Sequence, residues 1–62
     1  MDIIRIGNET HKIAGTPTKT VGDLLSGRWT VYRQTEDPEI VYAVEYRDGQ
    51  EYEERFERRA AV

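Results

Sequence analysis

The alternation of apolar and polar residues at the start of the chain predicts a β-hairpin. Ile4 and Ile6 alternate with polar neighbours, Gly7-Asn8 supplies residues that tolerate positive φ, and the chain then returns toward Ile13. This order of strand, turn and strand is typical of a tight hairpin. We therefore expect a hairpin over residues 2–14, with its isoleucines on one face.

The next segment predicts a short helix. Thr20 offers a hydroxyl at an N-cap, Asp23 follows three residues later, and Gly27 stands where a helix would stop. The apolar residues fall at helical spacing and would close one end of a sheet: Val21, Leu24 and Leu25. We expect a helix over residues 20–26, preceded by a linker-like stretch over 15–19.

The second half of the chain predicts a three-stranded meander over residues 28–59. A strand carrying Trp29, Val31 and Tyr32 ends before Pro38, because proline cannot donate to a ladder. Residues 40–47 alternate most regularly of all. One face of that strand carries Ile40, Tyr42, Val44 and Tyr46, and the other carries Val41, Ala43, Glu45 and Arg47.

Asp48-Gly49 is a strong hairpin signal, and the hydrophobic pattern favours one register around it. A two-residue loop would split the aromatic residues between the two faces. A three-residue loop pairs Val44 with Tyr52 and collects the large apolar groups on one face. We expect the three-residue loop, with the remaining pairs Tyr46 with Gln50 and Ile40 with Phe56. The same register turns a polar row toward solvent: Glu51, Glu53, Arg55 and Glu57.

A helix over residues 50–59 is the alternative to a third meander strand. Asp48 with Glu51 resembles a capping box, and Tyr52, Phe56 and Ala60 would form one helical stripe. The strand is favoured because the turn signal, and the need to cover a flank of the preceding strand, point the same way. The fold class expected is thus α+β and mostly β, one domain over residues 1–62. The architecture is that of an SH3-like half-open barrel or a small open sheet.

Composition narrows the means of stabilisation. The chain has 62 residues, no Cys and one His, which removes disulfides and ordinary zinc sites as supports. Small chains without such supports often self-associate or dock on a larger partner. The net charge is −3, and its acidic excess lies in the second half, which argues against nucleic acid as a partner. With no signal peptide or membrane-spanning run in the sequence, we expect a cytoplasmic protein without a membrane partner.

Candidate chemistry is sparse. Nucleophilic catalysis needs a hydroxyl or thiol beside a base, and the chain offers one serine, Ser26, and one histidine, His11. Ser26 fits the end of the predicted helix, and His11 fits a half-buried strand position beside Ile4 or Ile6. The glycines stand alone at turns and element ends, so no phosphate-binding loop is formed. We expect no enzyme, no cofactor and no metal.

Contact with another protein is the function that these features favour. Aromatic residues with arginine anchor protein interfaces, and most of the aromatic residues here are expected in the core. Tyr32, Val41 and Ala43 point the other way and form the expected exposed contact patch. The acid-rich strand, with Glu51 and Glu53 at its centre, is the second expected contact.

Two alternative functions stay open. A small nucleic-acid-binding barrel would use Trp29, Tyr32, Arg28 and Arg33 for stacking and phosphate contacts. An acidic inhibitor would occupy the basic groove of a nucleic-acid enzyme with a row of carboxylates spaced like phosphates: Asp48, Glu51, Glu53, Glu54 and Glu57.

Overall fold

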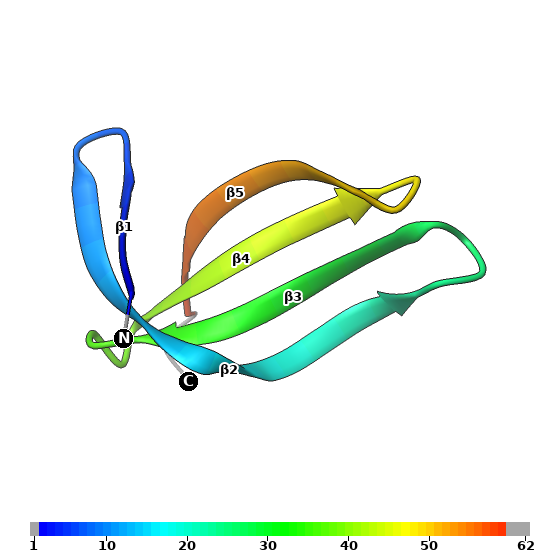
Figure 1. The fold of residues 1–62 in the computed structure, drawn as a ribbon. Coiled ribbons are helices and arrows are strands. Elements are labelled where there is room, and N and C mark those ends of the chain that lie inside the picture. The colour runs from blue at the N-terminus through cyan, green and yellow to red at the C-terminus, as the bar shows by residue number, and fades with distance from the viewer. Residues whose placement is uncertain (1, 60–62) are drawn as a thin grey trace.

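The computed structural model describes residues 2–59, which form five antiparallel strands in a curled half-barrel (Figure 1). The strands are β1 (Asp2–Ile6), β2 (Glu9–Asp23), β3 (Arg28–Thr35), β4 (Ile40–Arg47) and β5 (Gln50–Arg58). Each strand pairs with the next along the chain, in the order β1-β2-β3-β4-β5. The expectation of a mostly antiparallel β fold is confirmed, and the expectation of a short helix is wrong.

The curl of the sheet comes from the long strand β2. Its first part, Glu9 to Ile13, pairs with β1, and its later part pairs with β3. The register shifts on both sides of Pro17, and in Figure 1 the strand bends between the two parts. Register shifts bend a strand and increase its twist. Residues 15–19, expected to be a linker, therefore belong to the sheet.

The bend brings the two edges of the sheet near each other at one end of the molecule. His11 of β2 packs edge-on against Phe56 of β5, with ring centroids 4.7 Å apart. Glu9 forms an ion pair with Arg58 across the same gap. We call this the closed end, and we call the opposite end, where β2 turns into β3, the open end.

The core lies on the inner face, toward which the sheet curls. Its buried centre is Ile13, Tyr42 and Val44, and the half-buried side chains packed around it are Ile4, Ile6, Tyr46 and Phe56. The expected grouping of the hairpin isoleucines on one face is confirmed, because Asp2 pairs with Ile13 and Ile4 pairs with His11. On the outer face of β3 and β4 lie Arg28, Thr30, Tyr32, Gln34, Val41, Ala43, Glu45 and Arg47.

Residues 20–26, predicted as a helix, continue β2 to Asp23 and then form a turn. The carboxylate of Asp23 accepts a hydrogen bond from the backbone N–H of Ser26 at 2.7 Å. Gly22 has φ +103°, which lies outside the helical region. The features read as helix caps are shared by turns, and a segment this short gains too few helical hydrogen bonds to offset the cost of nucleation.

The β4–β5 turn also differs from the prediction. Its loop has two residues, Asp48 and Gly49, with φ of 52° and 78°, and Arg47 pairs with Gln50. Positive φ at both central residues is the type I′ pattern, whose twist matches that of the strands. The register then shifts between Glu45 and Tyr46. The predicted three-residue loop is wrong, because the structure combines a two-residue loop with a bulge.

The bulge decides where the aromatic residues of β5 lie. After it, Phe56 pairs with Tyr42 and returns to the inner face. Tyr52 lies at the bulge and is 58% exposed, so its expected place in the core is wrong. The strand expected for this segment is confirmed over Gln50–Arg58. Ala60, named in the helical alternative, lies outside the described residues.

Candidate functional site

The expected contact patch of Tyr32, Val41 and Ala43 lies together on the outer face. Tyr32 pairs directly with Ala43, and Val41 precedes it on the same face of β4. The expected exposure is wrong for two of the three, since Ala43 is fully buried and Val41 is 9% exposed. Arg55 and Glu57 of β5 pair with Ala43 and Val41 from the other side. The patch is therefore the floor of the outer face, and its contact role stays a prediction.

A shallow hollow of about 430 Å³ lies over this floor. Its lining comes from four strands and the residue after β5: Thr18, Lys19, Tyr32, Val41, Glu57 and Arg59. Glu57 accepts a hydrogen bond from Arg55 at 2.7 Å, so its charge is compensated. Tyr32 is the half-buried side chain of the expected patch that stays accessible here.

The acid-rich strand does not form one continuous row. Glu53 pairs with Glu45 on the outer face, whereas Glu51 pairs with Tyr46 on the inner face. Because the bulge separates the two, the expected common face of Glu51 and Glu53 is wrong. Glu54, on the inner face, accepts a hydrogen bond from the hydroxyl of Tyr42 at 2.6 Å. Burial, and then this carboxylate, raise the pKa of Tyr42 well above its usual value.

Arg55 compensates the outer acids. Its guanidinium lies 3.0 Å from Glu45, 3.0 Å from Glu53 and 2.7 Å from Glu57. The hydrogen bond to Glu57, followed by those to the other two acids, raises the pKa of Arg55. Arg47 adds a bond to Glu45 at 2.8 Å, and the bonds from Arg47 and Arg55 hold the pKa of Glu45 below its usual range. The outer acids are thus neutralised locally.

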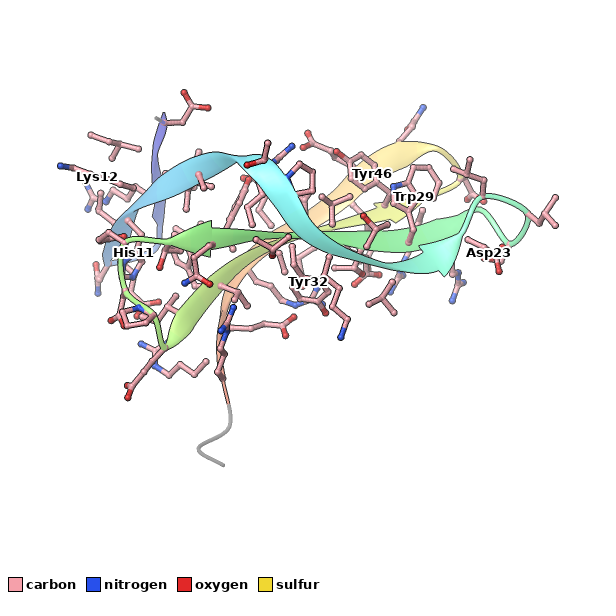
Figure 2. All side chains as sticks on the ribbon, turned by 90° about the horizontal axis from the view of Figure 1, so that it is seen from below. His11, Lys12, Asp23, Trp29, Tyr32 and Tyr46 are labelled. Carbon is pink, nitrogen blue, oxygen red and sulfur yellow. The ribbon has the colours of Figure 1, made fainter. Side chains whose placement is uncertain are left out.

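The residues suggested for nucleic-acid contact are divided between the faces. The rings of Trp29 and Tyr46 stack on the inner face, 5.0 Å apart and 9° from parallel, while Tyr32 lies on the opposite side of the sheet (Figure 2). Arg33 shares the inner face with Trp29, and Arg28 shares the outer face with Tyr32. The four side chains therefore do not form one stacking surface.

An exposed group of apolar side chains at the open end was missed as a site. Leu25 is 100% exposed, Leu24 is 77% exposed and Val21 is 47% exposed. We call these three residues the apolar tip. Their spacing predicts a helical stripe, which would bury them against the sheet. The signal that could have found the tip is Asp23 with Ser26 and Gly27, a set as suited to a turn as to a helix.

The apolar tip adjoins an unpaired strand edge. β1 covers β2 only as far as Ile13, so from Ala14 to Asp23 β2 has a strand on one side alone within the described part of the chain. Pro17 and Lys19 protect the middle of this edge, because proline and lysine discourage pairing with other strands. The last residues of the edge, Thr20 to Gly22, carry no such protection.

His11 has a structural environment. It is half-buried and pairs with Ile4, as expected. Its Nδ1 lies 3.0 Å from a carboxylate oxygen of Glu36, whose other oxygen accepts the backbone N–H of Lys12 at 3.1 Å. Burial opposes ionisation of Glu36, but these bonds outweigh it and lower its pKa. Ser26 lies in the β2–β3 turn at the open end, far along the chain from His11.

No group of three or more potential ligand side chains that could hold a metal ion occurs in residues 2–59. The same residues contain no helix that is long and apolar enough to cross a membrane. Comparisons of the chain with protein-family models, with curated proteins and with solved structures find no match.

Proposed function

We propose that the protein is a small non-enzymatic protein-binding module, and that its contact surface is the apolar tip together with the adjoining free edge of β2. The observation that carries this proposal is the full exposure of Leu25, beside the 77% exposure of Leu24. Two neighbouring leucines in a turn contribute nothing to the core of this chain. Burial of a leucine side chain stabilises by about 2 kcal/mol, which an interface would recover.

The free edge of β2 offers a partner chain backbone groups to pair with along the strand. Thr20, Val21 and Gly22 expose backbone groups on the side of β2 that no described strand covers. An extended segment of another chain gains main-chain hydrogen bonds at such an edge, and the leucines next to it supply apolar contact. A second copy of the protein and a larger partner both satisfy this geometry.

Sedimentation over a wide concentration range tests the self-associating form. We expect the wild type to dimerise and the double variant Leu24→Ser with Leu25→Ser to remain monomeric. Ile3 on β1 is 64% exposed at the closed end and provides the matched control, since Ile3→Ser removes an exposed apolar side chain elsewhere.

A photo-crosslinking residue at position 25, compared with one at position 3, tests docking on a larger partner. We expect a discrete adduct from position 25 that is absent from position 3. A wild type that stays monomeric, combined with equal or absent crosslinking at the two positions, would contradict the proposal.

A further inference from the structure

A buried hydrogen-bond donor of Arg33 has no partner. Arg33 lies on the inner face of β3, between Pro17 of β2 and Tyr42 of β4. Its Nε atom is buried and makes no hydrogen bond to any described residue. The ion pairs found among residues 2–59 involve other side chains. Arg33 is thus a half-buried cation that has no counterion among residues 2–59.

Such an arrangement costs stability. An unpaired buried donor destabilises the fold, and arginine cannot relieve the cost by losing its proton. The packing of the inner face does not require Arg33, because the inner face of β3 is otherwise formed by Trp29, Val31 and Thr35. Such a group calls for a physical explanation, and a ligand whose negative charge compensates the guanidinium is one.

Arg33 lines a hollow at the closed end of the inner face. The hollow has a volume of about 230 Å³ and is lined by Asp2, Ile4, Ile13, Ala14, Gly15, Arg33 and Tyr42. Ile4, Ile13 and Ala14 make part of its wall aliphatic, and Asp2, Arg33 and Tyr42 make the rest polar or aromatic. Its volume is below the roughly 300–1,000 Å³ of sites for drug-sized ligands. A small molecule with an aliphatic part and a polar group fits this lining.

We propose that this hollow binds a carboxylate carried on a short aliphatic body, with the guanidinium of Arg33 as its recognition group. Guanidinium and carboxylate match in geometry and form charge-assisted hydrogen bonds. Both the C-terminal residue of an aliphatic peptide and a small aliphatic acid carry this chemistry. The aliphatic part would lie against Ile4 and Ile13.

The charges around the hollow make the aliphatic part necessary. Asp2 lies at the lining and repels an anion, so charge alone gives little selectivity. The carboxylate of Glu54 is engaged by the hydroxyl of Tyr42 at 2.6 Å and does not pair with Arg33. The guanidinium is therefore free to donate hydrogen bonds to the carboxylate of a ligand.

Nuclear magnetic resonance titration of the full chain tests the proposal. The probes are 4-methylpentanoate, a short peptide ending in leucine with a free carboxylate, and the same peptide amidated. We expect saturable shifts of the Arg33 Nε–H signal and of the Ile4 and Ile13 methyl signals with a carboxylate probe. The amidated peptide should produce none. The carboxylate that binds more tightly identifies the source of the ligand.

Variants separate the role of Arg33 from general effects of charge. Arg33→Met should weaken binding about tenfold or more, the loss expected for one charge-assisted contact. Arg28→Met, on the exposed outer face of the same strand, should leave binding unchanged. Absence of a saturable shift, or shifts that persist in Arg33→Met, would overturn the proposal. Because the hollow and the apolar tip lie at opposite ends, this test and that of the proposed function can fail separately.

Discussion

The closed and open ends of the molecule are built from the same sheet but differ in what their side chains touch. At the closed end, Ile13 is 3% exposed and packs with Tyr42 and Val44 in the core. At the open end, where β2 turns into β3 (Figure 1), Leu25 is fully exposed. The difference shows that one end holds the fold together, while the other end is free to make contacts.

The bend in β2 explains this division. It lays the β1–β2 hairpin over the inner face at the closed end only, where His11 packs against Phe56. At the open end the inner face is finished by the stacked rings of Trp29 and Tyr46 instead. Segments with few buried contacts open at lower free energy. Hydrogen exchange should therefore be slowest at the closed end.

Substitutions to alanine at the two ends give the largest expected contrast. Ile13→Ala leaves a cavity in the core and should cost about 3 kcal/mol of unfolding free energy, whereas Leu25→Ala should change it by less than about 0.5 kcal/mol. Urea denaturation followed by tryptophan fluorescence measures both. If Ile13→Ala does not fold, Ile13→Val provides the milder step, with an expected cost of about 1 kcal/mol. Equal costs at the two ends would refute the division.

Glycine substitutions test whether the backbone of the open end is also constrained. Gly22 has φ +103°, and a Cβ there would clash with the carbonyl oxygen of Arg28. Gly22→Ala should therefore cost about 2 kcal/mol. Gly15→Ala is the matched control on the same strand, because nothing lies within 4 Å of its Cβ and its φ is not positive. A harmless Gly22→Ala would show that the open end rearranges freely.

These two ends also show how far the sequence alone could predict the fold. The alternation of Ile4 and Ile6, followed by the turn residue Gly7, predicted the closed-end hairpin, because the period-two pattern and the turn signal agree there. At the open end Val21, Leu24 and Leu25 fit helical spacing by accident. No local pattern states that a strand continues through Pro17 into a turn, since that is decided by pairing with β3.

The candidate sites could be predicted only in part for a related reason. The outer-face grouping of Tyr32, Val41 and Ala43 follows from alternation within single strands, and the structure has it. The burial of Val41 and Ala43 depends on Arg55 and Glu57 from a neighbouring strand, whose register is set by a bulge at Tyr52. A single inserted residue exchanges the faces of everything after it. The hollow beside Arg33 could not be predicted from the sequence, because its lining combines residues of the β1–β2 hairpin with residues of β3 and β4.

Removing Arg55 should have a smaller effect than either backbone or core changes. Arg55→Met leaves Glu45 and Glu53 directly opposite each other without their shared cation. Because the pairs are partly exposed, we expect a cost of about 1 kcal/mol, decreasing at high salt. Urea denaturation at low and high ionic strength measures it. Arg28→Met, on the same outer face, should show neither the cost nor the salt dependence.

The smallest expected effect concerns the polar contact that joins the closed-end hairpin to the β3–β4 turn. Glu36 bonds His11 and the backbone of Lys12, and its pKa is lowered in the folded state. A carboxyl group with a lowered folded pKa stabilises the fold above its unfolded pKa of about 4.5, and this contribution is lost as pH falls through the folded value. Glu36→Gln should therefore be slightly less stable than the wild type at pH 7, and the difference should be smaller at pH 3.

The comparison of urea midpoints at the two pH values needs a control from the same turn. Glu39 is exposed, and its side chain accepts no hydrogen bond from the described residues. Glu39→Gln should follow the wild type at both pH values. A Glu36→Gln deficit that is as large at pH 3 as at pH 7 would mean that Glu36 acts through packing and not through its charge. In that case the charge of Glu36 would add nothing to the closed end, which would be held by the apolar contacts of the hairpin and the Glu9–Arg58 ion pair.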